Sequence, residues 1–427
     1  MKDSIQHPGE TRANAIRQRL NAVVGLGQRT YTPTQLVVKE AQGCWITTVD
    51  GHRLIDFTSG VLVANLGHGH AGFEEKYRQY SEGLPRNAYN MVTEIEVTAS
   101  ERLLASMKSN PKAEKLLWAA SGSEGIQKAM WAAMHKHPDR PIMVATRHGF
   151  HGKKGLAGDV TGDRSPNPNV RFISFPMKEE RPESFYRDEL AALAEQHKDQ
   201  IALLITEPYL GAAGSFHPPK WYHQLLQVWC EEHDIALIFD EVQACHGRTG
   251  NMYAFESYGI EPDLVVLGKG LGNGEPAAAV AGRADLIDSL KYGEASDTFS
   301  ATPRACAAVC AALDVFEEER VVEHCRAMAK IMTGKFRELR EAFPFIKAIR
   351  GEGLVYGIEM EDAETANRAV LEAYRGENGQ GVHFLGPLAQ KVLRVSPPLV
   401  ISEAELDAAF ALLHTCWARV AAPLHAK

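Results

Sequence analysis

The sequence lacks long hydrophobic runs, and its 427 residues include no stretch of about 18 consecutive apolar residues, the length that crosses a bilayer. Residues 1–21 mix acidic and basic side chains without an apolar segment, so we expect neither a signal peptide nor a membrane anchor there. No run of Lys and Arg stands out, and 46 basic against 54 acidic residues give a net charge of −8. We therefore expect no nucleic acid and no membrane among the partners.

Cysteines are few and their spacing is irregular. The seven are Cys44, Cys230, Cys245, Cys306, Cys310, Cys325 and Cys416. An odd, scattered set lacks the paired spacing of a zinc site, and Cys306 and Cys310 fall in an Ala-rich helical pattern. We expect no bound metal and a reduced, cytoplasmic protein. Internal repeats and low-complexity linkers are absent as well.

Apolar segments instead alternate with helical patterns in the middle of the chain. The predicted strands are Ile142–Thr146, Asn169–Phe175, Ile201–Thr206, Ile235–Phe239, Leu264–Leu267 and Ala277–Ala281. Helical stretches in the long gaps predict an α/β domain with a largely parallel sheet. An Asp50-Gly51 turn predicts a hairpin near the start, and the residues after 320 form a separate α+β pattern. We expect a large domain over 59–320 and a smaller one from 1–58 with 321–427.

The stretch from Ile235 to Gly274 carries the most specific chemistry. Two apolar runs end at Asp240 and just before Lys269, and ligands of open α/β sheets bind at the carboxyl ends of strands. A lysine that joins the carbonyl of pyridoxal phosphate, with an aspartate at the pyridinium nitrogen, is what proteins contribute to that cofactor. Taken alone, a helix-capping aspartate and a solvated lysine explain these residues too. Glycines on both sides of Lys269 leave room for a bulky ring and favour the cofactor.

Two loops add to this hypothesis. Ala120-Ser121-Gly122-Ser123-Glu124-Gly125 opens a helix, and the free N–H groups of a helix start suit a phosphate, although an ordinary Ser cap is compatible with the same residues. Phe150 lies in a Gly-flanked loop with two histidines, where it either stacks on a cofactor ring or plugs the core. A nicotinamide oxidoreductase is disfavoured, because Gly268–Gly274 does not have the Gly-x-Gly-x-x-Gly spacing.

With these segments in place, the chain resembles the class III pyridoxal-phosphate-dependent aminotransferases of fold type I, from about Gly43 to Asp407. The motifs that carry the resemblance are Asp50-Gly51 with Ile55-Asp56-Phe57, Leu66-Gly67-His68, Ser121-Gly122-Ser123-Glu124, Phe150-His151-Gly152, Glu207-Pro208, Asp240-Glu241-Val242-Gln243, Gly247-Arg248-Thr249-Gly250, Gly268-Lys269-Gly270, Thr298-Phe299 with Pro303, and Arg394 with Pro397-Pro398-Leu399. The resemblance implies a large domain with a mostly parallel seven-stranded sheet, a smaller α+β domain, and a homodimer with shared active sites.

The resemblance also implies a role for each matched residue. Lys269 would bind the cofactor covalently and shuttle the proton, while Asp240 would hold the pyridinium nitrogen. The remaining cofactor-binding positions would be Gly122, Ser123, Phe150, Glu207, Gln243 and, across the dimer interface, Thr298. The implied activity is a ping-pong transfer of an amino group from an amino acid or amine to a 2-oxo acid.

Departures from the family pattern bear on the substrate. Ala244-Cys245-His246 replaces the usual Thr-Gly-Phe, and Ser300-Ala301-Thr302 replaces Gly-Gly-Asn. Leu210-Gly211-Ala212 stands where many members have Gln-Gly-Glu, whose glutamate pairs with the small-domain arginine. Without that carboxylate, Arg394 would remain available for a substrate carboxylate, unless it forms a structural salt bridge.

The alternatives left open are a decarboxylase or a racemase or epimerase on the same scaffold, and a non-catalytic protein that retains the cofactor. The sequence does not identify the amino donor or acceptor.

Overall fold

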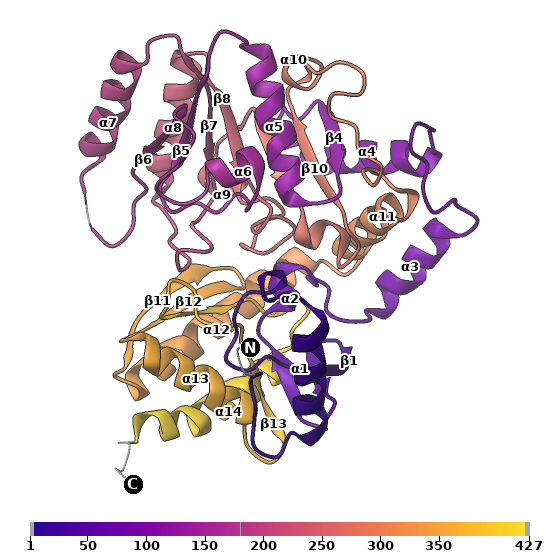
Figure 1. The fold of residues 1–427 in the computed structure, drawn as a ribbon, viewed down its shortest axis with the longest axis vertical. Coiled ribbons are helices and arrows are strands. Elements are labelled where there is room, and N and C mark those ends of the chain that lie inside the picture. Colours follow the sequence, from indigo (N-terminus) through magenta and orange to yellow (C-terminus); the bar gives the residue numbers. More distant parts are fainter. Residues whose placement is uncertain (1–3, 180, 423–427) are drawn as a thin grey trace. The chain divides into compact units, whose positions relative to one another are not determined.

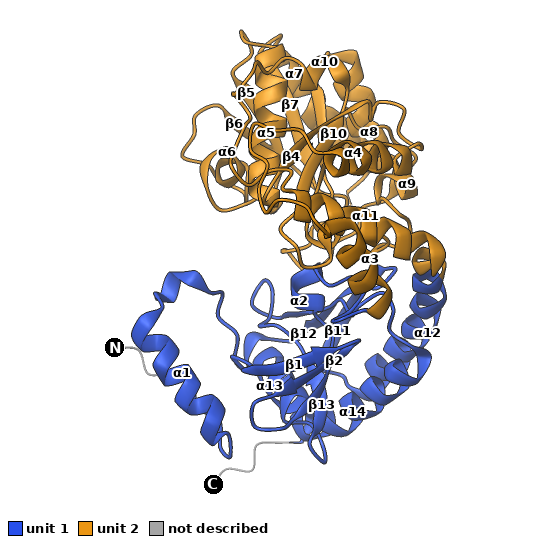
Figure 2. Cartoon of the chain, turned by 90° about the vertical axis from the view of Figure 1, so that its right-hand side faces the viewer, with its two compact units in different colours: residues 1–70, 324–427 blue, residues 71–323 orange. Residues whose placement is uncertain are grey.

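The computed structural model describes residues 4–179 and 181–422 and divides into two compact units (Figure 2). Unit 1 comprises residues 1–70 and 324–427, and unit 2 comprises residues 71–323. The parts of the predicted small domain at 1–3 and 423–427 lie outside the described residues. Residues 59–70, which the sequence grouped with the large domain, belong to unit 1. Backbone bonds between Gly43 and His68 (2.7 and 2.9 Å), and a contact from His68 to Asp56, tie that segment to unit 1.

Unit 2 is an α/β domain (Figure 1). Its helices are α3 (Ala71–Ser81), α4 (Glu94–Ser106), α5 (Gly122–Lys136), α6 (Gly155–Asp159), α7 (Glu183–Gln196), α8 (Lys220–Glu232), α9 (Phe255–Tyr258), η2 (Lys269–Gly272), α10 (Ala284–Ile287) and α11 (Pro303–Glu318). Its strands are β4 (Lys115–Ala119), β5 (Ile142–Thr146), β6 (Val170–Ile173), β7 (Ile201–Thr206), β8 (Ala236–Asp240), β9 (Leu264–Leu267) and β10 (Ala278–Gly282). The predicted central strands are thus confirmed to within a few residues at each end.

These strands form one seven-stranded sheet in the order β4-β10-β9-β8-β7-β5-β6. The pairs from β9 through β6 are parallel, whereas β10 runs antiparallel to both β9 and β4. The predicted fold, a mostly parallel sheet of seven strands, is confirmed. In a sheet of this kind the carboxyl ends of neighbouring parallel strands meet at one edge, which positions the residues that follow them.

Helices cover both faces of the sheet, so its strands are apolar on both sides. Leu264 and Val266 of β9 pack with α5, while Val265 and Leu267 pack in a cluster that includes residues of α4 and α11. A third cluster joins β5 and β7 to α7 and α8. Alternate residues of one strand therefore serve opposite faces, and burial on both faces explains why these strands appear in the sequence as continuous apolar runs.

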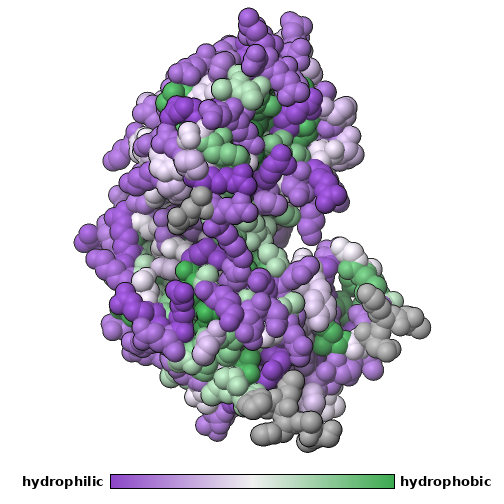
Figure 3. Space-filling model, turned by 90° about the vertical axis from the view of Figure 1, so that its left-hand side faces the viewer, coloured by the Kyte–Doolittle hydropathy of each residue, from purple (hydrophilic) through white to green (hydrophobic). Residues whose placement is uncertain are grey.

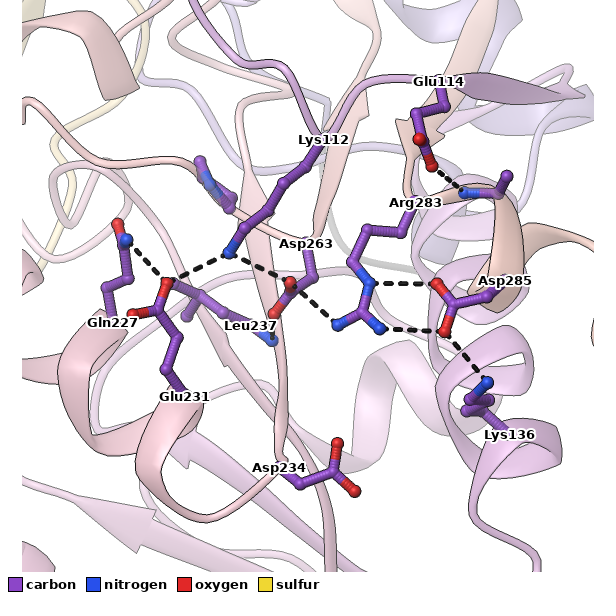
Figure 4. A network of polar contacts seen from close by, with 12 residues as sticks. Lys112, Glu114, Lys136, Gln227, Glu231, Asp234, Leu237, Asp263, Arg283 and Asp285 are labelled. Atoms are coloured by element: carbon purple, nitrogen blue, oxygen red, sulfur yellow. Dashed lines mark hydrogen bonds and ion pairs between the residues drawn. The ribbon is translucent and has the colours of Figure 1, made fainter.

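The amino edge of the sheet carries a network of ion pairs around Asp263 (Figure 4). Asp263 Oδ1 lies 3.2 Å from Lys112 Nζ and 3.3 Å from Arg283 Nη1, and Oδ2 accepts the N–H of Leu237 at 2.9 Å. Arg283 also pairs with Asp285. A cavity of about 160 Å³ lies among these side chains. The network fastens the starts of β8 and β9 to the end of β10.

Unit 1 is an α+β module with two small sheets. Its elements are α1 (Thr11–Val23), η1 (Leu26–Gln28), β1 (Val38–Gln42), β2 (Trp45–Thr48), β3 (Arg53–Asp56), α2 (Ser59–Leu62), α12 (Val321–Ala342, which begins at the end of unit 2), β11 (Ile346–Glu352), β12 (Val355–Met360), α13 (Ala363–Arg375), β13 (Gln380–His383), β14 (Val392–Val395) and α14 (Glu403–Ala421). One sheet has the order β1-β2-β3-β13 and the other β11-β12-β14.

The predicted hairpin is confirmed, since β2 and β3 pair antiparallel around Asp50-Gly51. The last strand of this unit, β14, ends at Val395, because Pro397 and Pro398 have no N–H groups to extend the ladder.

Hydrophilic residues predominate on the face shown in Figure 3, with apolar residues scattered among them. Among the residues that the structure describes, no helix combines the length and the apolar character needed to cross a membrane.

Candidate active site

Asp240 and Lys269 follow adjacent parallel strands. Asp240 ends β8 and pairs in register with Val266 of β9, and the N–H of Glu241 donates to the carbonyl of Val266 at 2.9 Å. Lys269 comes three residues after Val266, directly beyond β9, with a left-handed φ of 45° and a half-buried side chain. The sheet therefore brings the acid and the amine to the same carboxyl edge, as their positions in the sequence predicted.

Asp240 is held in place by a histidine. Its side chain lies 2.8 Å through Oδ2 from His151 Nδ1, and its Oδ1 accepts the N–H of Val242 at 3.0 Å. Both side chains are buried, and His151 Nε2 has no hydrogen-bond partner among the described residues. A carboxylate fixed this way can accept a hydrogen bond from a protonated ring nitrogen. The sequence contained His151 in the Phe-His-Gly motif, but its pairing with Asp240 depends on contacts across the fold.

Gly122 and Ser123 form the first turn of α5. Ser121 caps the helix by accepting the N–H of Glu124, and the Glu124 carboxylate accepts the N–H of Ala120 at 3.1 Å. The N–H groups of Gly122 and Ser123 have no partner within the helix, as at any helix start. A Cβ at Gly122 would lie 2.8 Å from Cγ1 of Val242, so only glycine allows this helix start to approach the Asp240 loop. The result is an anion-binding corner close to Asp240.

Phe150 and Gln243 are both supported by Glu207. The Phe150 N–H donates to Glu207 Oε1 at 2.9 Å, and the Gly211 N–H donates to Oε2 at 3.4 Å. A Cβ at Gly211 would lie 2.7 Å from Oε1 of Gln243, so the Gln243 side chain lies directly against this backbone. Burial raises the pKa of Glu207 to about 7, against the opposing effect of His151.

The loop after β8 contains the buried ionisable side chains of Glu241, Cys245 and His246. Glu241 is fully buried and accepts the N–H groups of Ala254 (2.8 Å) and Phe255 (2.7 Å), while burial raises its pKa to about 8. Cys245 donates to the Gly268 carbonyl at 3.5 Å, next to Lys269, and burial raises the pKa of its thiol to about 12. Burial lowers the pKa of His246 to about 4, so this ring is neutral near pH 7.

Thr298 and Arg394 lie apart from this cluster in the chain. Thr298 is exposed in unit 2, and its carbonyl accepts a hydrogen bond from Asn87 Nδ2 at 2.6 Å. Arg394 belongs to β14 of unit 1, pairs in register with Gly357 of β12, and is 8% exposed. Thr298 therefore belongs to unit 2, like Asp240 and Lys269, and Arg394 belongs to unit 1.

Together the residues of unit 2 fit pyridoxal phosphate. Lys269 could supply an amine for its carbonyl, and Asp240, fixed by His151, could supply an acceptor for its ring nitrogen. The first turn of α5 could supply N–H groups for its phosphate. Among the described residues, no group of three or more His, Cys, Asp and Glu side chains is arranged to hold a metal ion.

Comparison with known proteins agrees with this chemistry. Residues 26–417 match the family described as aminotransferase class-III. The acetylornithine aminotransferase of Methanopyrus kandleri is 33% identical over 385 residues, covering 90% of this chain and 95% of that protein. The 5-aminovalerate aminotransferase of Pseudomonas putida is 29% identical over 425 residues, covering 95% of this chain and 99% of that protein. The structure of ornithine aminotransferase from Toxoplasma gondii matches with a TM-score of 0.81 at 26% identity, covering 96% of this chain and 95% of that one.

Proposed function

The chain belongs to the class III aminotransferases, and from that premise we propose how its own residues move an amino group from a donor to a 2-oxo acid. It is a pyridoxal-phosphate-dependent aminotransferase of fold type I. The observation that supports the assignment of residues most strongly is the placement of Asp240 and Lys269 beyond adjacent parallel strands, with Asp240 fixed by His151.

The cofactor supplies a ring that accepts electrons from the substrate carbon when its proton leaves. In our proposal, Asp240 keeps a proton on the ring nitrogen, and His151 keeps the Asp240 carboxylate oriented. The Lys269 amine takes the proton from the substrate carbon that bears the amino group. It then delivers that proton to the cofactor carbon to which the transferred nitrogen is attached.

The other matched residues bind and orient the cofactor. Gly122 and Ser123 would donate N–H groups to the phosphate, because they begin α5. Phe150 would pack on the ring, and Gln243 would bind the ring hydroxyl. Glu207 holds the backbone beside both of them.

Replacement of the lysine tests the assignment. We expect Lys269→Ala to lower turnover by at least about a thousandfold, since proton transfer and covalent attachment of the cofactor are lost together. Lys291→Ala, at an exposed lysine of the same unit, should retain wild-type turnover. Turnover by stopped-flow and the visible absorbance of the bound cofactor are the measurements. A Lys269→Ala protein that turns over at the wild-type rate would disprove the proposed role.

We propose that one substrate carries a carboxylate that meets Arg394. Burial of the guanidinium supports this, together with Ala212 in place of a competing glutamate. The relatives named for acetylornithine and 5-aminovalerate point to donors that carry both an amine and a carboxylate. Incubation with amino acids and with simple amines, without an oxo acid, identifies the donor as the one that changes the cofactor's absorbance. Release of carbon dioxide or loss of chirality instead would indicate the decarboxylase or racemase alternative.

We also propose that the protein is a homodimer in which Thr298 reaches the phosphate site of the neighbouring subunit. Large apolar side chains are exposed on two segments of unit 2, and a bond from Asn87 to Thr298 together with a contact from Tyr89 to Ser296 (3.4 Å) joins these segments. The exposed side chains are Tyr89, Met91, Val92, Tyr292 and Phe299. Apolar groups gathered in this way indicate a protein interface. Light scattering should give twice the mass of one chain.

A cytoplasmic location is proposed on the basis of the cysteines. All seven are buried and lie outside any disulfide, and thiols in this state persist in a reducing compartment.

A further inference from the structure

Lys128 is a buried cation that the proposed mechanism does not use. It lies on α5, one turn beyond Glu124, and is 4% exposed. Its Nζ donates to the Trp118 carbonyl at 2.6 Å, to Asp297 Oδ2 at 2.7 Å and to Ser300 Oγ at 3.1 Å. All three ammonium protons therefore have acceptors, which offsets the cost of burying the charge.

Asp297, the partner of Lys128, also accepts hydrogen bonds from the backbone of its own segment. Its Oδ1 accepts the N–H groups of Phe299 at 3.1 Å and Ser300 at 2.7 Å, and its Oδ2 accepts the Ser300 hydroxyl. Burial alone would raise the pKa of Asp297, but the hydrogen bonds from Lys128 and Ser300 lower it below its usual value. The carboxylate is therefore ionised near neutral pH and closes the turn around Thr298.

The rest of the segment is fixed as well. Ala301 has a left-handed φ of 53°, and the Thr302 hydroxyl caps α11 by accepting the N–H of Ala305 at 3.3 Å. Thr298, between these anchors, is exposed. The turn of residues 297–302 thus holds Thr298 on the surface through the ion pair between the half-buried Asp297 and the buried Lys128 of α5.

We propose that Lys128 is a positioning residue that holds the 297–302 turn in the shape in which Thr298 binds the cofactor phosphate of the neighbouring subunit. This inference rests on the proposed function, in particular on the homodimer. Lys128 contacts the turn at two points, the Asp297 carboxylate and the Ser300 hydroxyl, and so ties the residues on either side of Thr298 to α5. In this proposal α5 binds the phosphate of its own subunit's cofactor at its first turn. Through Lys128 it also orders the segment that contacts the phosphate in the neighbouring subunit.

The test compares two ligands that differ only in the phosphate. The dissociation constants of pyridoxal phosphate and of pyridoxal are measured by absorbance titration of the full-length protein freed of cofactor. Lys128→Met removes the charge and keeps an unbranched side chain one atom shorter. We expect it to weaken pyridoxal phosphate binding about tenfold, the value of one hydrogen bond to a charged group, and to leave pyridoxal binding unchanged.

Two further variants make the test specific. Lys136→Met removes a lysine of the same helix that pairs only at the surface with Asp285, so it should change neither constant. Ser300→Ala removes one acceptor of Lys128 but leaves Lys128 paired with Asp297, and should reproduce a smaller, equally selective loss. If Lys128→Met does not fold, Ser300→Ala decides the matter alone.

Thr298→Ala separates the inference from the function on which it rests. If Thr298→Ala weakens pyridoxal phosphate binding and Lys128→Met adds nothing to it in the double variant, the proposal holds. If Thr298→Ala weakens pyridoxal phosphate binding and Lys128→Met does not, only the positioning role of Lys128 is overturned. If Thr298→Ala binds pyridoxal phosphate normally, the role of Thr298 in the dimer fails and the inference fails with it. Equal weakening of both ligands by Lys128→Met would show a general structural role and overturn the proposal.

Discussion

Asp263 at the amino edge of the seven-stranded sheet and Asp240 at its carboxyl edge are equally buried, each 4% exposed. Asp263 pairs with Lys112 and Arg283 and accepts a backbone N–H (Figure 4). Asp240 pairs with a single histidine and one backbone N–H. The first carboxylate is neutralised by two permanent cations, whereas the second is oriented by a ring that itself has a nitrogen without a partner among the described residues.

The carboxyl groups near Asp240 also have fewer cationic partners than those near Asp263. Near Asp240, the buried carboxyls of Glu207 and Glu241 have pKa values raised by burial to about 7 and about 8. At the amino edge, the carboxylates of Glu231, Asp263 and Asp285 all lie next to a lysine or an arginine. One edge is therefore built for stability, and the other tolerates costly burial where a ligand with its own charges binds.

The largest expected effect is on turnover at the carboxyl edge. Asp240→Asn keeps the shape of the side chain but removes the charge that, in the proposed function, would keep a proton on the ring nitrogen. We expect turnover to fall at least about a hundredfold, as when one preorganised electrostatic contact is lost. The urea midpoint of the protein should change little. Steady-state kinetics and urea unfolding measure the two, and a variant with normal turnover would remove the distinction between the edges.

The opposite pattern is expected at the amino edge. Asp263→Asn leaves Lys112 and Arg283 without their shared partner and should lower the free energy of unfolding by about 2 kcal/mol. Turnover per folded molecule should stay at the wild-type value. The control is Asp234→Asn, at an exposed residue of the same edge paired with Arg140, which should cost less than about 0.5 kcal/mol. Urea unfolding at one protein concentration provides the comparison, and equal losses in the two variants would contradict it.

A third expected effect is a pH dependence of stability at Glu207. Its folded-state pKa of about 7 exceeds the unfolded value of 4.5, so the folded state binds the extra proton between these values. Its contribution to stability is complete below the lower value and is lost as pH rises through about 7. Glu207→Gln should therefore gain stability relative to the wild type between about pH 5 and about pH 8, in urea unfolding of the cofactor-free protein. A constant difference across that range would refute the raised pKa.

Much of this site could be predicted from the sequence, because its residues lie next to local patterns that mark strand ends and helix starts. Asp240 and Lys269 each follow a buried apolar run, and Gly122 and Ser123 open a helix after a strand, so strand ends and helix starts alone predicted their edge. The α1 helix was not predicted. Its buried residues are Ala13 and Arg17, and Arg17 is stabilised by Glu10 and by the carbonyl of Gln35, contacts that no hydrophobic period shows.

The sequence by itself determined the α/β class, the family and the strand ends that carry the acid and the amine, because short-range patterns encode buried strands, turns and helix starts. Only the tertiary structure decided that His151 holds Asp240, that Glu207 supports Phe150 and Gly211, and that Lys128 anchors the turn around Thr298. Apart from Glu207 and Gly211, which are four residues apart, these pairs are separated by 57 to 169 residues, and a buried polar group takes whichever partner the packed fold brings within hydrogen-bonding distance.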